Sequence, residues 1–463
     1  MKSPKKLLGA IPLAMINIIA IDNLRALPQG AQLGLSLVTY YFFATILFFA
    51  PVALVSTVFA THYPEKGGIY VWIKKSLGKR SALLVIWIQW IYNVVWYPTQ
   101  MTFVASTLAM LFDPTLANKA YYLVPTMLVL FWFFTYLNAM GMKWSSNIST
   151  WGALLGTLLP ISLIILLGLY WFFTEPNQYA IELSWSQLIP EWRTEFMSYM
   201  PGIMFGLVGI EVSAYHADEV IEPRKTFPRA ILLSSVIIFL SMVLASLAIA
   251  LIVPHGDIDI ITGMSMAFLQ VLERSQLPII QPIITILILL GGCATVATWI
   301  IGPSKGVLIA AQDGLAPKML ARTNKHGAPS AVLIIQALVF SALSCFYILV
   351  PEEINVVYML LNALVSQLSL IVYIILFVGY LYAYNTLKNE SGYHIPGGHI
   401  AARVIGYIGI LSCLAGMLTA FLIPDIIKGF SYPIYIFALL AGMAIFAIIP
   451  FLYILRKTES NAI

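Results

Sequence analysis

Apolar residues occur in long runs that short polar segments separate. About 20 apolar residues cross the hydrocarbon core of a bilayer as an α-helix, and twelve runs reach about that length. No segment between them exceeds about 30 residues, which is too short for a domain with its own core. We therefore predict an all-α polytopic membrane protein, one transmembrane domain over 1–463, with twelve helices at 7–30, 35–60, 81–112, 120–140, 150–173, 196–216, 229–253, 278–301, 329–349, 354–384, 404–423 and 433–455.

The composition supports this prediction. Hydrophobic residues make up 60% of the chain and charged residues 10%, whereas soluble domains average about 45–50% and about 25%. The net charge of +5 is explained by membrane orientation, so we expect no nucleic-acid partner. Three cysteines in apolar runs indicate neither a disulfide framework nor a metal site, and we expect no cofactor. The first run lacks a small-residue cleavage site, which predicts an uncleaved first span.

The basic residues predict the orientation. Of the 25 Lys and Arg residues, one lies inside the first span, and the loops opposite the termini hold four. The remaining twenty lie on the side that an even number of spans gives to both termini. Because cytoplasmic loops are enriched in Lys and Arg, we expect a multi-pass protein of the cell (inner) membrane with both termini in the cytoplasm.

Acidic residues interrupt two of the runs. Asp22, followed by Asn23 and Arg25, lies in the first run, and Glu211 lies in the sixth. A charge at the centre of a span costs roughly 2.5 to 3.5 kcal/mol on insertion scales, so it usually has a partner, a water-filled cavity or a substrate. Interruptions in spans one and six match transporters built from two repeats with broken helices at a central site. We expect repeats at 7–173 and 196–384, with two additional helices in 404–455.

Broken helices suit a zwitterionic substrate. Their freed N–H groups attract a carboxylate, and their freed carbonyls attract an ammonium. We therefore expect an amino acid or amine as substrate, in a site formed by Asp22, Asn23, Gly206, Gly209, Glu211 and Ser213. The aromatic residues Trp299 and Tyr373 belong to the same site, or they pack within the bundle.

Asp22 has two interpretations. It forms an i, i+3 ion pair with Arg25 near the outer surface, or it meets a substrate ammonium or a proton while Arg25 serves an outer gate. Glu211 has no basic residue within one helical turn. Burial favours the neutral form of a carboxyl, so we expect Glu211 to exchange a proton during transport, with Asp22 as second candidate. His216 caps the cytoplasmic end or serves the site. Thr295 and Thr298 offer hydroxyls to a sodium ion, or they bond to their own helix.

Several segments resemble the amino acid-polyamine-organocation superfamily: 64–72 (Pro-Glu-Lys-Gly-Gly-Ile-Tyr-Val-Trp), 219–223 and 228–230. Others resemble the bacterial glutamate/GABA antiporter family: 209–216 (Gly-Ile-Glu-Val-Ser-Ala-Tyr-His), 299–306 (Trp-Ile-Ile-Gly-Pro-Ser-Lys-Gly), 311–312 and 395–398 (Ile-Pro-Gly-Gly). The resemblance covers nearly the whole chain. It implies a leucine-transporter-like fold of 5+5 inverted spans plus two, with helices 1 and 6 broken, alternating access and amino acid exchange. It places Glu211 and Tyr373 beside the substrate.

The chain also departs from that family. Ser369 replaces the first of the family's two tyrosines in span ten, and Asp22 falls where a tyrosine is expected in span one. The family's acidic residue in span eight is replaced near Thr295. The chain ends at Ile463, without the long tail of the acid-resistance members. The acid at position 22 suggests a more cationic or amine-bearing substrate than glutamate.

We therefore expect an antiporter that exchanges an amino acid for a related amino acid or amine, and the resemblance offers a glutamate/GABA-like pair as one candidate. The alternative is a proton-coupled uptake symporter for an amino acid or amine. An enzyme is not expected, because no His-rich or paired-Asp cluster lies on a cytoplasmic loop, and no repeated filter-like segment indicates a channel. The sequence does not predict the oligomeric state.

Overall fold

The computed structural model describes residues 8–65, 67–140, 152, 154–190, 197–274, 278–349, 354–424 and 431–460. Side chains are described throughout these ranges except at 216, 218, 278 and 450–460, so His216 lies outside the described side chains. The basic residues of 1–7 and Lys66, Lys143, Arg193 and Lys428 lie outside the described residues. Within the described ranges the chain is helical, with turns, loops and one isolated bridge between Leu8 and Val220, which confirms the predicted all-α class.

The first half of the chain contains short helices around one very long helix. In order they are α1 Ala10–Ile21, η1 Leu24–Ala26, α2 Leu27–Ala31, η2 Gly34–Ser36, α3 Leu37–Ala44, η3 Thr45–Phe49, α4 Ala50–His62, α5 Ile69–Ser76, α6 Lys79–Ala109, η4 Pro114–Asn118, α7 Ala120–Ala139, η5 Leu154–Leu158, α9 Leu159–Thr174 and α10 Trp185–Leu188.

The second half contains the longest helices. It runs α12 Met200–Gly206, η6 Ile210–Glu219, α13 Pro223–Ile252, η7 His255–Asp257, α14 Gly263–Arg274, η8 Pro278–Ile280, α15 Gln281–Gln312, η9 Lys318–Ala321, α16 Ser330–Ser344, α17 Phe346–Leu349, α18 Ile354–Leu387, α19 Gly398–Thr419 and α20 Tyr432–Ser460.

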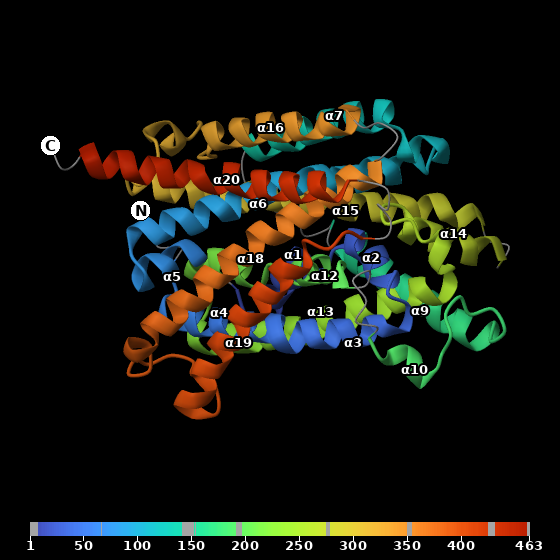
Figure 1. The fold of residues 1–463 in the computed structure, drawn as a ribbon, viewed down its shortest axis with the longest axis horizontal. Coiled ribbons are helices and arrows are strands. Elements are labelled where there is room, and N and C mark those ends of the chain that lie inside the picture. Colours follow the sequence, from blue (N-terminus) through green and yellow to red (C-terminus); the bar gives the residue numbers. More distant parts are fainter. Residues whose placement is uncertain are drawn as a thin grey trace.

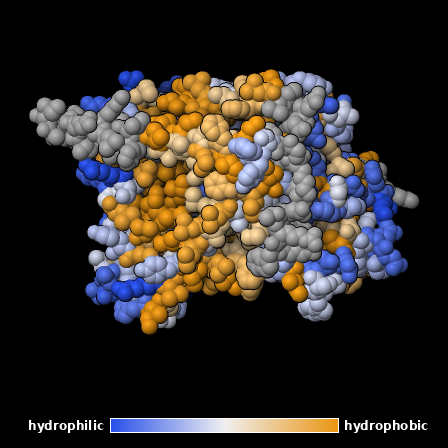
Figure 2. Space-filling model, in the orientation of Figure 1, coloured by the Kyte–Doolittle hydropathy of each residue, from blue (hydrophilic) through white to orange (hydrophobic). Residues whose placement is uncertain are grey.

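Most of these helices run along the long axis of the molecule, with α5 at one end and the short helices α10 and α14 at the other (Figure 1). The space-filling view shows a broad hydrophobic band across the middle of the bundle, with hydrophilic residues towards both ends (Figure 2). Exposed apolar side chains of this kind are stable only against lipid. The band therefore marks the part of the protein that the bilayer surrounds.

Nine helical segments in the described part of the chain are long and apolar enough to cross a membrane, and a tenth forms if α1 and α2 count as one bent span. Two of the twelve predicted spans fail this test. One is α6, which is 31 residues long but carries many polar side chains, and the other is the sixth, which is interrupted after Gly206. Both lie at the centre of the bundle, where polar groups face protein instead of lipid.

Close backbone contacts join η5 and α9 to their neighbours. A Cβ on Gly156 would lie 2.1 Å from the backbone nitrogen of Gly291 in α15, and a Cβ on Gly168 would lie 2.4 Å from the Cβ of Ala248 in α13. Small residues permit this approach of membrane helices. The fifth predicted span is thereby packed directly against the seventh and the eighth.

Candidate functional site

The first predicted span changes direction at Asp22 and Asn23. Helix α1 ends at Ile21, both following residues are extended, and the chain resumes as η1 and α2 at an angle of 44°. The Asn23 side chain caps the second piece, because its Oδ1 accepts the N–H of Arg25 at 3.1 Å. Its Nδ2 donates to Oε1 of Gln100 on α6 at 3.1 Å. The bend thus frees backbone groups in the middle of the bundle.

The sixth predicted span is interrupted between Gly206 and Ile210. The break needs glycine, because Gly209 has φ +125° and its missing Cβ would lie 3.2 Å from Ile21 and 3.3 Å from Trp299. Such a backbone conformation disfavours any other residue. The two interrupted spans therefore meet at Gly209, against the indole of Trp299, which also donates to the carbonyl of Ala20 at 3.3 Å.

Replacing Gly209 with alanine is expected to reduce both stability and transport. The positive φ costs about 1–3 kcal/mol for a residue with a side chain, and the added methyl displaces Ile21 or Trp299. Thermal unfolding in detergent and transport in proteoliposomes measure the two losses. Gly302→Ala is the matched control, because Gly302 is helical, a Cβ there meets nothing within 4 Å, and we expect no loss. Equal behaviour of the two variants would contradict this account of the break.

Glu211 is buried directly behind the break and is held by two side chains. The hydroxyl of Tyr373 on α18 donates to Oε2 at 2.8 Å and accepts the N–H of Gly209 at 3.2 Å. Nε2 of Gln89 on α6 lies 3.3 Å from Oε1, and Tyr215 donates to Oε1 of Gln89 at 2.6 Å. A change in the charge of Glu211 would therefore act through Tyr373 on the backbone of the break.

A cavity of about 30 Å³ lies between the two breaks and has room for one or two water molecules. The predicted site residues Asn23, Gly206 and Trp299 line it, together with Ala20, Arg25, Tyr92, Asn93, Trp96 and Val208.

Arg25 is the charged residue on the wall of this cavity, and its side chain is 3% exposed. Nη1 donates to the hydroxyl of Tyr358 at 2.8 Å and to Oδ1 of Asn362 at 3.2 Å, both on α18. Nε has no hydrogen-bond partner, and no carboxylate of the described residues forms an ion pair with this guanidinium. A buried cation without an ion-paired anion is costly.

Asp22 and Ser213 do not line the cavity. Both carboxylate oxygens of Asp22 accept the hydroxyl of Ser241 on α13, at 2.9 and 3.0 Å. The structure therefore shows no ion pair between Asp22 and Arg25, and the contact of Asp22 with a substrate ammonium or a proton stays a prediction. Ser213 donates to the carbonyl of Ile210.

The hydroxyls of Thr295 and Thr298 both donate to carbonyls of their own helix. This arrangement matches the second of the two expectations for these threonines.

Helix α6 contributes buried amide side chains to the site that we did not predict from the sequence. Gln89, Asn93 and Gln100 lie on one face of this helix, at spacings of four and seven residues, and all three are buried. Residues separated by four and seven positions share a helix face. An amide stripe within a predicted span was therefore the signal that could have identified these residues, of which Asn93 lines the cavity, Gln89 contacts Glu211 and Gln100 contacts Asn23.

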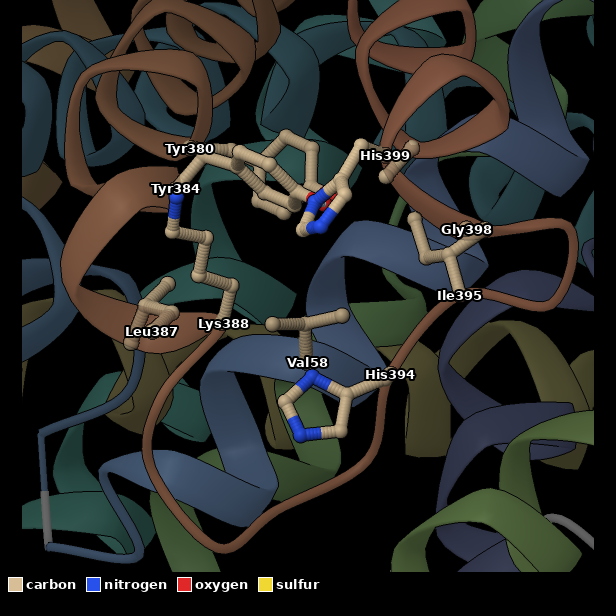
Figure 3. Close-up of a pocket in the computed structure, with 10 residues that line it drawn as sticks. Val58, Tyr380, Tyr384, Leu387, Lys388, His394, Ile395, Gly398 and His399 are labelled. Atoms are coloured by element: carbon tan, nitrogen blue, oxygen red, sulfur yellow. Dashed lines mark hydrogen bonds between the residues drawn. The ribbon is translucent and has the colours of Figure 1, made fainter.

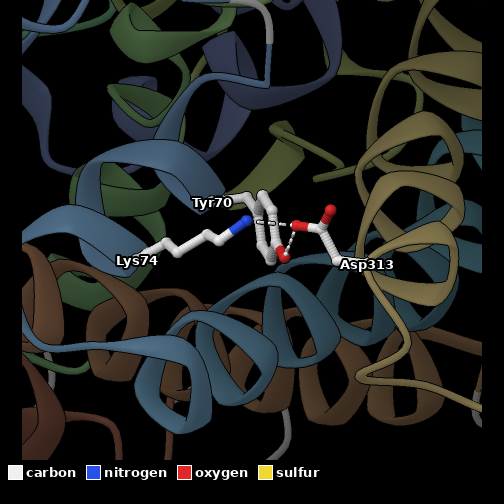
Figure 4. Close-up of polar contacts among 3 residues, drawn as sticks. All are labelled: Tyr70, Lys74 and Asp313. Atoms are coloured by element: carbon white, nitrogen blue, oxygen red, sulfur yellow. Dashed lines mark hydrogen bonds and ion pairs between the residues drawn. The ribbon is translucent and has the colours of Figure 1, made fainter.

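A polar contact at the end of the bundle that carries α5 joins that helix to the end of α15 (Figure 4). Tyr70 donates to Oδ2 of Asp313 at 2.6 Å, and Lys74 forms an ion pair with the same oxygen. Partial burial opposes the ionised form of Asp313, but the hydrogen bonds from Lys74 and Tyr70 and the charges of Lys74 and Lys79 prevail and lower its pKa. The carboxylate is therefore ionised throughout the range in which transport is measured.

Because the pKa of Asp313 lies below its usual value, this contact loses its contribution only as the pH falls through that lowered pKa. Asp313→Asn is therefore expected to leave the shape of the pH profile of transport unchanged between about pH 5 and pH 8. Transport rates in proteoliposomes over this range test the prediction. A profile that becomes flat in the variant would place the pH-sensing group at Asp313 and contradict it.

Comparisons with known proteins agree with this architecture. A family model described as amino acid permease matches residues 13–458. The chain is 42% identical to an uncharacterized transporter of Legionella pneumophila, lpg1691, over 99% of both chains. It is 26% identical to a glutamate/gamma-aminobutyrate antiporter of Lactococcus lactis, over 92% of this chain and 86% of the relative. It is 21% identical to a cadaverine/lysine antiporter of Escherichia coli, over 80% and 79%.

Proposed function

Because the chain belongs to the amino acid permease family of the amino acid-polyamine-organocation superfamily, we propose that it exchanges an amino acid for a related amino acid or amine by alternating access. It is a multi-pass membrane transporter and not an enzyme. Named relatives are antiporters of glutamate and gamma-aminobutyrate and of cadaverine and lysine, so exchange recurs among proteins that resemble the chain over most of its length.

The proposed topology has twelve spans, arranged as two inverted repeats of five plus two, with spans one and six broken. The 44° bend between α1 and α2 and the interruption between α12 and η6 support the two breaks. The length of α6 is sufficient for a span, although its polar residues lower its mean hydropathy. The excess of basic residues supports cytoplasmic termini in the inner membrane.

The environment of Arg25 is the observation that supports the proposed substrate class. A buried guanidinium on the cavity wall, with an unpaired Nε and no ion pair to a described carboxylate, favours a ligand with a carboxylate and no net positive charge. We expect glutamate-like substrates and neutral amino acids to bind better than lysine or cadaverine. This preference differs from the cationic or amine-bearing preference that the acid at position 22 suggests, and the substrate panel below distinguishes the two.

The remaining site residues take roles in the same scheme. Asn23, Gly206 and Gly209 shape the breaks, and Trp299 covers the cavity. Glu211 and Asp22 remain the two candidates for proton coupling, and Tyr373 links Glu211 to the break. The contacts of Arg25 with α18 also make it a candidate for gating, because substrate entry would separate them.

Counterflow in proteoliposomes tests the proposal. Vesicles loaded with an unlabelled amino acid are expected to accumulate the labelled amino acid transiently, without a proton gradient. A panel with acidic, neutral and basic amino acids and their amines identifies the substrate. Absence of counterflow for every member would contradict exchange.

The alternative function, a proton-coupled uptake symporter, is favoured by the buried carboxyl of Glu211 beside the break. A symporter accumulates its substrate in empty vesicles when an inward proton gradient is imposed. An obligatory antiporter does not. Accumulation in empty vesicles, abolished by a protonophore, would therefore favour the alternative.

A further inference from the structure

A second and larger cavity lies among helices α4, α18 and α19. Its volume is about 140 Å³, and it lies between the ends of α4 and α18 and the first turns of α19 (Figure 3). Its walls include Val58, Tyr380, Leu387 and Ala402. None of its lining residues lines the central cavity, so it is a separate feature of the molecule.

Basic side chains surround this cavity. Lys388, His394 and His399 line it, and all three are exposed. A hydrogen bond of 2.7 Å joins Nδ1 of His399 to the hydroxyl of Tyr384, whose ring lies 5.9 Å from the guanidinium carbon of Arg403. No aspartate or glutamate is among the lining residues in the described part of the chain. The cavity therefore favours an anion.

Contacts within the protein hold the walls of this cavity in place. His62, at the end of α4, bonds through Nε2 to the carbonyl of Leu387 at 3.2 Å. The N–H of Tyr393 donates to Oγ1 of Thr61 at 3.0 Å, and a Cβ on Gly392 would lie 2.3 Å from the ring of His62. The segment between α18 and α19 is thus tied to α4, and the cavity is already formed.

The same cavity adjoins a lipid-facing surface of α19. Ile400 is 80% exposed, and Val404, Tyr407 and Leu411 follow on the same helix face with exposed side chains. In a helix that is a candidate membrane span, such residues contact acyl chains. This apolar stripe begins one residue after His399. A ligand at the basic cavity can therefore extend directly along the stripe.

We infer that this cavity binds the phosphate of an anionic phospholipid, with Lys388 and His399 on the cavity wall, Arg403 next to them beside the ring of Tyr384, and the acyl chains along the α19 stripe. Basic pockets between membrane helices suit such headgroups, and charge-assisted hydrogen bonds to phosphate are strong. A soluble phosphate would meet the same cations but would leave the stripe unused. The inference does not depend on the transported substrate.

Thermal unfolding of the full-length protein in detergent tests the inference. Titrated dioleoylphosphatidylglycerol is expected to raise the Tm, whereas dioleoylphosphatidylcholine and soluble glycerol 1-phosphate are not. Each basic residue near a membrane surface favours anionic lipid by about fivefold. The double variant Lys388→Gln/Arg403→Gln is therefore expected to raise the half-saturating concentration of phosphatidylglycerol by about 25-fold. Arg322→Gln/Lys325→Gln, two exposed basic residues after α15, is the matched control and should stay near the wild type.

Two results would overturn the inference. One is an equal response of the Lys388/Arg403 variant and its control, which would show that the lipid binds elsewhere. The other is an equal rise in Tm with glycerol 1-phosphate, which would identify a soluble phosphate as the ligand. If the double variant does not fold, Lys388→Gln alone alters one exposed side chain and is expected to show about a fivefold change.

Discussion

Arg25→Gln is expected to raise the KM for a carboxylate-bearing substrate by about 30-fold or more. The guanidinium is buried on the cavity wall, and removal of one partner from a buried, hydrogen-bonded charge pair costs about 2–5 kcal/mol. About 2 kcal/mol corresponds to a 30-fold change in affinity. The KM is measured from the concentration dependence of exchange in proteoliposomes, with Arg322→Gln, a variant of an exposed arginine, as the control. Glutamine keeps a hydrogen-bonding group towards Tyr358, so the protein is expected to fold.

The comparison of an amino acid with its matched amine separates binding from gating. If Arg25 binds the carboxylate, Arg25→Gln weakens binding of the amino acid. Binding of the amine, which lacks a carboxylate, is then unchanged or stronger. If Arg25 only closes the outer side through Tyr358 and Asn362, both substrates change in proportion. A proportional change would contradict the proposed substrate contact without contradicting exchange itself.

Glu211→Gln is expected to abolish the pH dependence of exchange and to lower its rate at least tenfold. The amide cannot ionise, and it replaces one of two acceptor oxygens with a donor. In the variant that donor faces the hydroxyl of Tyr373 or the amide of Gln89. Both of these groups donate to the carboxylate of Glu211 in the wild type. Rates between pH 5 and pH 8, with equal pH on both sides of the membrane, measure the effect.

Tyr373→Phe is the companion variant. It keeps the carboxyl of Glu211 but removes the hydroxyl that connects it to the N–H of Gly209. We expect pH dependence to persist in this variant while the rate falls, because the carboxyl still titrates but no longer acts on the break. A pH profile of Glu211→Gln that matches the wild type would exclude Glu211 as the proton-coupling group.

The sequence predicted those features that depend on local composition. Runs of apolar residues indicated the helices, and the acids at 22 and 211 indicated the two interruptions, because a charge is costly in a bilayer wherever the chain folds. Glycine at 209 was predicted as part of the site, and the structure adds the reason, which is its positive φ beside Trp299. These features need no knowledge of tertiary contacts.

The directions in which the side chains point could not be predicted from the sequence. Asp22 and Arg25 lie three residues apart, yet the bend between them sends Asp22 towards Ser241 on α13 and Arg25 towards Tyr358 on α18. An i, i+3 ion pair requires a continuous helix. Asp22 indicated an interruption of the first span, and because the helix ends there, Asp22 and Arg25 cannot pair in this way. The polar face of α6 contacts groups more than 70 positions away.

The contact between Gly156 and Gly291 has a practical consequence for experiments on motion. Because these two helices touch backbone to backbone, we expect η5 and α15 to move together during transport. Spectroscopic probes on their lipid-facing sides would report a constant separation in every state of the transport cycle. That distance then serves as an internal reference for measuring displacements of the interrupted spans in a single sample.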